Sequence, residues 1–216
     1  MVTLTTFRNV PAFAIGHVRD LRVRWALEEA GQEYDLRLVG FEETSQPAYR
    51  REQPFGQVPV LQDGDMTLFE SGAMLVHLGE TFPVLMPSAR GERAAVMMWM
   101  FAALNSVEPY VAELANLIAF AKDEAWAIEH RPAAEELALK RLDSVDVWLE
   151  GRDYLAGSFS AADILMTTVL RLLDGMDLVE RFARLRAYRD RCMARPAFQK
   201  ALADQAALYA SAPVAA

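Results

Sequence analysis

The sequence predicts a small α/β domain followed by an all-helical domain. A strand, a helix and a second strand are expected within the first 39 residues, the βαβ pattern that is typical of a parallel sheet. Pro83 and Pro87 mark a change in composition, and no further strand is convincing from Arg90 onward. We therefore expect an α/β domain over residues 1–83 and an all-α domain over residues 90–216.

Composition and charge describe a globular protein that forms a hydrophobic core. The chain has 216 residues, of which 53% are hydrophobic and 24% are charged, and its formal net charge is −8. This acidic balance, without a basic stripe, argues against nucleic acid as a partner. Charges interrupt the apolar stretches before they reach the length of about 18 residues that a membrane span needs. No membrane association is expected.

Cysteine usage, the first residues and the spacing of the histidines add three further expectations. The single cysteine, Cys192, excludes an internal disulfide framework and is typical of a reducing compartment. The first residues lack a positive charge followed by a long apolar stretch, so we expect a cytoplasmic protein. His17, His77 and His130 lie far apart without metal-ligand spacing, so no metal is expected.

The first domain is expected to begin with a strand over Val2–Phe7, where β-branched and apolar residues alternate. An irregular loop follows over residues 8–19. A helix is predicted over residues 21–30, with Asp20 as its N-cap and Gly31 as its stop. The next expected elements are a strand over Tyr34–Val39 and a short helix over Thr44–Glu52.

The segment from Gln57 to Ser71 places a strand, a turn, a second strand and a helix start within 15 residues. Pro59 interrupts the first apolar run, and a proline in a strand is confined to edges, strand starts or bulges because it has no N–H. Residues 62–65 include a glycine and favour a hairpin turn. A helix is predicted over residues 71–81. Periodicity alone indicates an ordinary hairpin that leads into a helix.

The second domain is predicted to consist of helices. Ala94–Phe120 is apolar at helical period over a length well beyond that of the average helix, and Glu135–Leu149 repeats this pattern. Ser160 and Asp163 have the form of a capping box in front of an almost entirely apolar helix over residues 164–173. Two more helices are expected, over residues 182–193 and 196–208, the second of which begins with a proline.

In their order and spacing, these features resemble the glutathione transferase family. The resemblance covers essentially the whole chain and rests on five features: the strand and loop before RVRWALEEAG (residues 22–31), the GQVPVL segment (56–61), the Glu70–Ser71 pair, the proline-marked linker and the Ser160–Asp163 cap. It implies a thioredoxin-like N-terminal domain, a helical C-terminal domain and a homodimer. It also implies that the peptide bond before Pro59 is cis.

The resemblance implies a glutathione site around the hairpin. The backbone of Val58, before Pro59, is expected to pair with glutathione as with an added strand. The helix start at Ser71 suits the γ-glutamyl carboxylate, and Glu70 is expected to bind the amino group. The alternative is that both residues only stabilise the helix start. Gln57 is expected beside the bound peptide. Candidates for the glycyl carboxylate are Arg50, Arg51 and Gln53, unless these residues simply form a solvated face.

The sequence departs from the family pattern at the position of the residue that activates the glutathione thiol. The well-known classes place Tyr, Ser or Cys just after the first strand, and residues 8–19 contain none of them. Activation requires the thiol pKa to fall from about 8.5. Asn9 lies nearest the expected position and Arg19 lies at the helix start, so these two are the catalytic candidates. A turn role for Asn9 and a salt bridge from Arg19 to the second domain are equally open, and His17 is expected to face solvent.

Two residues of the second domain are candidates for the ligand site. Asn105 interrupts an apolar helical stretch, where an uncompensated buried amide would cost on the order of 1–3 kcal/mol. We expect it to face the ligand or to bond to a neighbouring carbonyl. Tyr110 is a candidate for the wall of the electrophile site. Asp163 is expected to be structural, and Cys192 is expected to be a small core residue.

The sequence therefore predicts a glutathione transferase-like enzyme. Bound glutathione, the expected co-substrate, would attack an apolar electrophile, while the protein supplies binding, orientation and thiolate stabilisation. Glutathione-dependent reduction of disulfides or peroxides is a second hypothesis. A non-catalytic glutathione-binding scaffold is a third, which the missing Tyr, Ser or Cys favours and the Val58–Pro59 and Glu70–Ser71 pairs oppose.

Overall fold

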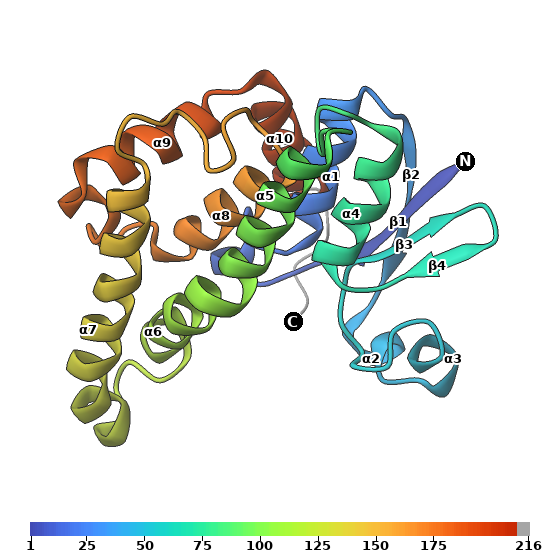
Figure 1. Ribbon diagram of the computed structural model, residues 1–216. Coiled ribbons are helices and arrows are strands. Elements are labelled where there is room, and N and C mark those ends of the chain that lie inside the picture. Colours follow the sequence, from blue (N-terminus) through green and yellow to red (C-terminus); the bar gives the residue numbers. More distant parts are fainter. Residues whose placement is uncertain (211–216) are drawn as a thin grey trace. The chain divides into compact units, whose positions relative to one another are not determined.

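The structure is a computed structural model that describes residues 1–210. By their internal contacts the residues form two compact units: unit 1 contains Met1–Met86 and the chain from Arg195 on, and unit 2 contains residues 87–194 (Figure 1). This grouping differs from the predicted ranges, 1–83 and 90–216, because the last helix belongs to unit 1. Its apolar face is visible in the sequence, whereas the surface that this face packs against is not. The predicted range also includes residues 211–216, which lie outside the described residues.

Unit 1 is built on a mixed four-stranded sheet with the order β2–β1–β3–β4. β1 (Val2–Phe7) and β2 (Tyr34–Val39) are parallel, and both have the predicted bounds. β3 (Val60–Asp63) pairs antiparallel with β1 and with β4 (Met66–Leu68). β3 begins at Val60, directly after the proline that interrupts the predicted apolar run, because a proline cannot donate to the strand ladder.

Three helices of 11 or more residues complete unit 1: α1 (Asp20–Ala30), α4 (Ser71–Thr81) and α10 (Pro196–Ala210). α1 packs against β1, α4 and α10 (Figure 1). The rings of Trp25 from α1 and Phe198 from α10 are fully buried, with their centroids 4.8 Å apart. This aromatic contact is the centre of the packing between α1 and α10.

Short turns replace some predicted elements. The helix expected over residues 44–52 is instead two single turns, α2 (Phe41–Thr44) and α3 (Pro47–Arg50). Pro47 separates the two turns. A proline disfavours the helical conformation in the residue before it, and it suits the first turn of the helix that follows. Residues 8–19, called the β1–α1 loop below, contain a 3₁₀ turn over Ala12–Ala14. α1 ends at Gly31, whose φ of 62° is easily adopted by glycine.

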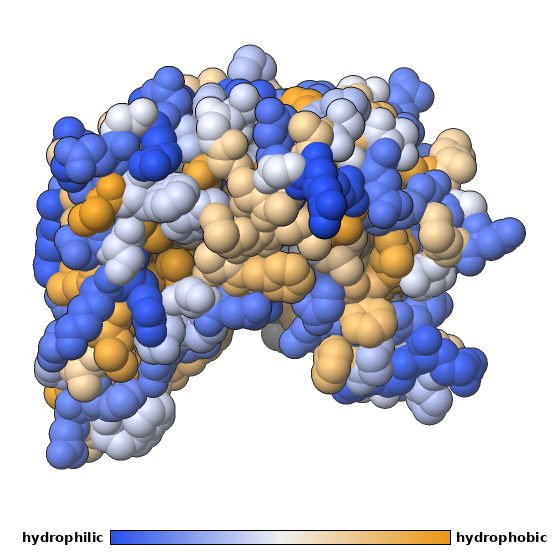
Figure 2. Space-filling model, in the orientation of Figure 1, coloured by the Kyte–Doolittle hydropathy of each residue, from blue (hydrophilic) through white to orange (hydrophobic). Residues whose placement is uncertain are grey.

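Unit 2 is helical. Its helices are α5 (Arg90–Phe101), α6 (Glu108–Phe120), α7 (Ala125–Trp148), α8 (Ala161–Leu170) and α9 (Ala183–Met193), with 3₁₀ turns over Arg171–Leu173 and Val179–Arg181. α7 begins at Ala125 rather than at the predicted Glu135 and continues through Pro132. Its outer surface is mostly hydrophilic, with separate hydrophobic side chains between the polar ones (Figure 2). Among residues 1–210, no helix is long and apolar enough to cross a membrane.

A π-helical turn over Ala102–Val107 joins α5 to α6. Here the N–H of Glu108 bonds to the carbonyl of Ala103, five residues earlier. Pro109 follows directly, and a proline ring clashes with the carbonyl four residues before it, which is that of Asn105. The wider π turn is a local arrangement that relieves such a clash. The long apolar tract of the sequence is therefore two helices with an irregular joint.

The buried α8 is the centre of unit 2, and its predicted capping box is confirmed. Asp163 accepts hydrogen bonds from the N–H groups of Ser160 at 2.9 Å and Leu155 at 3.0 Å, and from the Tyr188 hydroxyl at 3.0 Å. Asp163 is fully buried, so it has the structural role that was expected. Cys192 is also fully buried, in agreement with the predicted core position.

Candidate functional site

Glu70 lies at the start of α4, where the chain passes from the hairpin into the helix. It is the N-cap residue and has φ 69° and ψ 114°, a conformation that is strained for a residue with a side chain. The side chain is exposed. Strain of this kind costs on the order of 1–3 kcal/mol and concentrates at functional sites. The strained backbone therefore marks Glu70 as a candidate for function.

The hydroxyl of Ser71 does not cap α4. No side-chain hydrogen bond caps this helix start, and Ser71 Oγ instead accepts a hydrogen bond from Arg22 Nη1 at 3.2 Å. Both side chains are buried. Because the guanidinium occupies one acceptor position of the serine oxygen, the hydroxyl proton is left for another acceptor. The simple helix-cap role considered for Ser71 is therefore not the one that the structure contains.

Arg22 is a residue of this site that the sequence analysis missed. It belongs to α1, for which the sequence predicts a helix but no ligand contact. Arg22 and Arg24 are 3% and 1% exposed, and two arginines inside an otherwise apolar helix segment were the available signal. Arg24 Nε bonds to Asp20 Oδ2 at 2.6 Å. Asp20 is accordingly the first residue of α1 and not its N-cap, which is Arg19.

Val58 and Pro59 are joined by a cis peptide bond. The Val58 side chain packs in a small buried cluster with Val39, Tyr49 and Val60. Across residues 1–210, no hydrogen bond reaches the N–H or the C=O of Val58. An extended peptide that lies along this segment would find both groups unpaired.

Tyr49 fixes the backbone beside Val58. Its hydroxyl donates a hydrogen bond to the carbonyl of Gln57 at 2.7 Å. Burial raises the pKa of Tyr49 to about 12, so the hydroxyl stays protonated at neutral pH. The side chain of Gln57 is exposed and projects from this anchored backbone. Tyr49 was not predicted, because a single tyrosine in a short polar segment carries no recognisable signal.

The three candidates for the glycyl carboxylate have different surroundings. Arg50 is exposed and donates to the carbonyl of Pro54 at 2.8 Å. Gln53 is only 2% exposed, and its Oε1 accepts the N–H of Phe55 at 2.7 Å. Arg51 is exposed, and no hydrogen bond or ion pair engages it within residues 1–210. Arg51 therefore has a guanidinium that is available to a ligand.

The β1–α1 loop brings the two catalytic candidates to opposite ends of one segment. Asn9 is half-buried, two residues after β1, and Arg19 is exposed at the N-cap position of α1. His17 is half-buried, so the expectation that it faces solvent is only partly met. The loop lies on the N-terminal side of α1, where backbone N–H groups and the positive end of the helix dipole favour an anion.

Comparison with known proteins identifies the family. The model of the glutathione S-transferase N-terminal domain matches residues 8–80, and that of the C-terminal domain matches residues 99–196. The chain belongs to the glutathione S-transferase family. It is 32% identical over 191 residues to glutathione S-transferase 4 of Zea mays, an alignment that covers 83% of this chain and 85% of that protein.

Solved glutathione transferases have the same fold. Glutathione transferase F7 from Populus trichocarpa superposes with a TM-score of 0.82 at 25% identity, over 95% of this chain and 99% of that chain. A glutathione transferase from Pseudomonas putida, solved with one glutathione disulfide bound per subunit, has a TM-score of 0.81 at 23% identity, over 93% of this chain and 90% of that chain. The predicted fold class is thereby confirmed.

In unit 2 of this glutathione S-transferase family member, Asn105 is exposed on the π turn. The cost of an uncompensated buried amide therefore does not arise at this position. Tyr110 is half-buried, and its hydroxyl accepts a hydrogen bond from Arg141 Nη2 at 2.9 Å. The Arg141 guanidinium also lies 4.3 Å from the centroid of the tyrosine ring. Ligand contact by Asn105 and Tyr110 stays a prediction.

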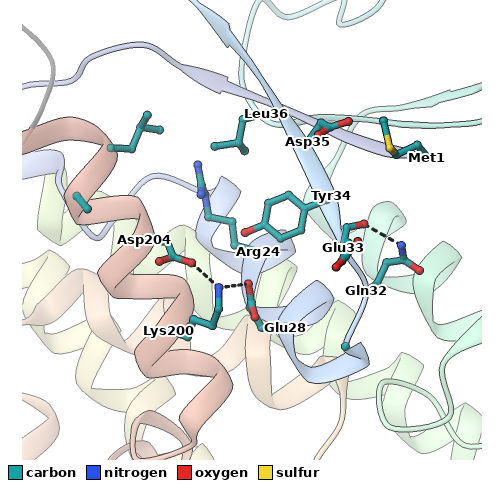
Figure 3. Close-up of a pocket in the computed structure, with 13 residues that line it drawn as sticks. Met1, Arg24, Glu28, Gln32, Glu33, Tyr34, Asp35, Leu36, Lys200 and Asp204 are labelled. Carbon is teal, nitrogen blue, oxygen red and sulfur yellow. Dashed lines mark hydrogen bonds and ion pairs between the residues drawn. The ribbon is translucent and has the colours of Figure 1, made fainter.

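A cavity of about 950 Å³ within unit 1 lies between α1, β2 and α10, and none of the predicted site residues lines it. Figure 3 shows Lys200 of α10 between Glu28 of α1 and Asp204. The ammonium is 2.9 Å from Glu28 Oε1 and 2.6 Å from Asp204 Oδ2. Tyr34, from β2, points toward Arg24 across the cavity. The side chains here tie α10 to α1 through charge and are separate from the candidate site residues.

Proposed function

We propose that this protein binds glutathione in unit 1 and uses its thiolate to attack an apolar electrophile. In this reaction the sulfur forms a bond to an electrophilic carbon, and the leaving group departs with the electron pair of the broken bond. The observation that supports the proposal most is the combination of an unpaired Val58 backbone with a free hydroxyl donor and a strained glutamate at the start of α4.

The γ-glutamyl end of glutathione binds at the start of α4. Its carboxylate accepts hydrogen bonds from the Ser71 hydroxyl and from the first N–H groups of the helix, which are unpaired within an α-helix. The buried guanidinium of Arg22, 3.2 Å from Ser71 Oγ, adds a positive charge behind the serine. The exposed carboxylate of Glu70 binds the amino group, so both charges of the γ-glutamyl end are matched.

The rest of the peptide lies along the segment before β3. The N–H and C=O of Val58 pair with the backbone on either side of the cysteinyl residue, as in strand addition. The side-chain amide of Gln57 contacts the same backbone. Arg51 binds the glycyl carboxylate in preference to Arg50 and Gln53, because the latter two already form hydrogen bonds within the protein.

Thiolate formation depends on the β1–α1 loop. Asn9 donates an amide hydrogen bond to the sulfur, and Arg19 with the N-terminal end of α1 adds positive charge, so the thiolate is favoured over the thiol. On the electrophile side, Asn105 and Tyr110 are the proposed contacts. The protein is proposed to act as a homodimer, which the exposed ring pair of Phe55 and Phe69 supports, with centroids 6.3 Å apart.

A second candidate function is glutathione-dependent reduction of a disulfide or peroxide. The β1–α1 loop has no Tyr, Ser or Cys, and the Pseudomonas putida relative was solved with glutathione disulfide bound. Reduction yields such a disulfide when one glutathione attacks sulfur or oxygen and a second completes the exchange. A scaffold that binds glutathione without turnover is the non-catalytic alternative.

Calorimetry with glutathione tests the binding step first. We expect binding at millimolar ligand or tighter, and a loss of about tenfold in affinity in Ser71→Ala, since a hydrogen bond to a charged group contributes on the order of 1.5–3 kcal/mol. Asp65→Asn, which removes an exposed carboxylate in the hairpin turn, is the matched control. No binding to the unmodified protein would exclude both enzymatic functions.

Turnover assays then separate the reactions. The unmodified protein is expected to conjugate a chloronitrobenzene and to reduce disulfides and hydroperoxides slowly or not at all. Rapid reduction of disulfides or hydroperoxides with slow or absent conjugation would instead indicate the reductase function. Binding without turnover in any assay would leave the scaffold function.

A further inference from the structure

The α10 helix, the last among residues 1–210, reaches both ends of the β1–α1 loop, beginning with the end of β1. The Tyr209 hydroxyl of α10 lies 3.0 Å from Thr6 Oγ1, one residue before the last position of β1. Thr6 is fully buried and Tyr209 is 5% exposed. Burial raises the pKa of Tyr209, so its hydroxyl stays protonated and keeps this hydrogen bond at neutral pH.

The other end of the loop is held by Gln205. Its Nε2 donates to the carbonyl of Val18 at 3.2 Å and to Asp20 Oδ1 at 2.6 Å. Gln205 and Asp20 are both fully buried. The carbonyl of Val18 also accepts the N–H of Leu21 at 3.0 Å, so the amide of Gln205 is attached directly to the first turn of α1.

Both contacts come from one face of α10. Gln205 and Tyr209 are four residues apart, a spacing that places side chains one above the other on a helix. Thr6 lies just before the β1–α1 loop and Val18 lies near the end of the loop that leads into α1, so two adjacent side chains of one helix hold both ends of the loop. The loop itself has only a single 3₁₀ turn of regular structure.

We propose that Gln205 and Tyr209 are positioning residues for thiol activation, which they support by holding the β1–α1 loop at both ends. This inference rests on the proposed function, because it assumes that the loop activates glutathione. In a loop without Tyr, Ser or Cys, activation relies on an amide, a guanidinium and a helix terminus. The stabilisation that such groups give to a thiolate falls with their distance from the sulfur. A displacement of the loop by about 1 Å is enough to lower the reaction rate by a large factor.

Three variants of α10 test the proposal. Gln205→Met preserves the length of the side chain and removes both hydrogen bonds, and Tyr209→Phe removes only a hydroxyl. Lys200→Met is the matched control, because it removes the ion pair with Glu28 that ties the same helix to α1 beside the cavity described above, together with the pair to Asp204 within α10 (Figure 3). Lys200 makes neither of the two loop contacts. The Lys200→Met variant therefore distinguishes the effect of loosening α10 from the effect of displacing the loop.

Two measurements are made on each variant. Amide hydrogen exchange in the ligand-free protein reports on residues 8–19. We expect it to accelerate several-fold in Gln205→Met and Tyr209→Phe and to stay unchanged in Lys200→Met. The ionisation of bound glutathione, followed by the ultraviolet absorbance of the thiolate, gives the bound-thiol pKa. We expect this pKa to rise by up to about one unit, a tenfold loss of thiolate at a pH below it, with glutathione affinity changed less than about twofold because the γ-glutamyl site is intact.

The outcomes separate this inference from the proposed function. Unchanged exchange in both loop variants, or equal acceleration in Lys200→Met, overturns the positioning role whatever the activity. Faster exchange with an unchanged bound-thiol pKa also overturns it, because the loop is then held but does not activate the thiol. If the unmodified protein binds no glutathione, the proposed function fails, and with it the assignment to thiol activation.

Discussion

Arg22 of α1 donates a hydrogen bond of 3.2 Å to the hydroxyl of Ser71 at the start of α4, and both side chains are buried. The contact joins the helix that follows the β1–α1 loop to the helix start that would receive the γ-glutamyl carboxylate. It also sets the direction of the serine hydroxyl, because an oxygen that accepts from the guanidinium has its own proton free to donate. One arginine thus supplies charge and orientation together.

Arg22→Met is expected to weaken glutathione binding. The change keeps the apolar stem of the side chain and removes the charge and the donor to Ser71. Hydrogen bonds that involve a charged group contribute on the order of 1.5–3 kcal/mol, so the dissociation constant measured by calorimetry is expected to rise about tenfold or more. Arg181→Met is the control, since it removes the exposed ion pair with Glu135 in unit 2. An equal loss in both variants would contradict the role of Arg22.

Glu70→Gly is expected to raise stability while lowering glutathione affinity. Glycine adopts a φ of 69° without the strain that a side chain incurs, so the free energy of unfolding is expected to increase by roughly 1 kcal/mol. The carboxylate that would bind the amino group of glutathione is lost in the same change. Chemical denaturation and calorimetry measure the two effects separately.

Asp177→Gly is the matched control for Glu70→Gly. Asp177 is the other non-glycine residue with positive φ among residues 1–210, with a φ of 54°. We expect a similar gain in stability and no change in glutathione affinity. A loss of affinity in the control, or an unchanged affinity in Glu70→Gly, would remove Glu70 from the site.

Asp163 is expected to make the stability of the protein depend on pH. Burial raises its pKa to about 6, although the hydrogen bonds from Leu155, Tyr188 and Ser160 act in the opposite direction. The pKa in the unfolded chain is about 3.9, so between these two values the native state binds more protons. The free energy of unfolding therefore falls as pH rises from about 4 to about 6, by up to about 3 kcal/mol from this group.

Asp163→Asn tests this dependence because it removes the titration and nearly preserves the shape. Denaturation by urea at pH 4.5 and at pH 7 is expected to show a smaller difference in the variant than in the unmodified protein. At pH 7 the variant is also expected to be less stable, since its amide nitrogen cannot accept the hydrogen bonds that the carboxylate accepts. Equal pH dependence in the two proteins would assign the effect to other groups.

Tyr110→Phe is expected to change the KM for the electrophile more than the KM for glutathione. The variant loses the hydrogen bond from Arg141 and keeps the ring that the guanidinium lies over, so the loss of stability is expected to be no more than about 1 kcal/mol. Steady-state assays are expected to show an altered KM for a chloronitrobenzene and an unaltered KM for glutathione. Arg141→Met removes the same hydrogen bond, and an identical change in KM there would indicate an indirect effect.

The elements with strong local signals were predictable from the sequence. β1, β2 and α4 have their predicted bounds, and Gly31 ends α1, because alternation, helical period and glycine are properties of neighbouring residues. The capping box at Ser160 is local in the same way. The π turn was not predictable to the same degree, because Pro109 acts on the carbonyl of a residue four positions earlier within a continuous apolar pattern.

The contacts of the candidate site were less predictable than its segments. The Glu70–Ser71 pair is visible in the sequence, but Arg22 reaches it from 49 residues away. Tyr49 supports Gln57 through a hydroxyl-to-carbonyl bond, which leaves no pattern in composition. Gln205 reaches the β1–α1 loop from 187 residues away. Such partners are determined by tertiary packing, and a single sequence records the side chains without recording which of them meet.

The assignment of α10 to unit 1 also bears on how the protein is made. Unit 1 needs residues 1–86 and the chain from Arg195 on, whereas unit 2 is continuous over residues 87–194. During synthesis from the N-terminus, unit 2 is therefore the first to have its whole sequence outside the ribosome. Until α10 emerges, Trp25 lacks the ring of Phe198, Asp20 lacks the amide of Gln205, and Thr6 lacks the hydroxyl of Tyr209. The unit whose first strand and helix are made first is therefore completed last, and α1 stays uncovered on its α10 side during that interval.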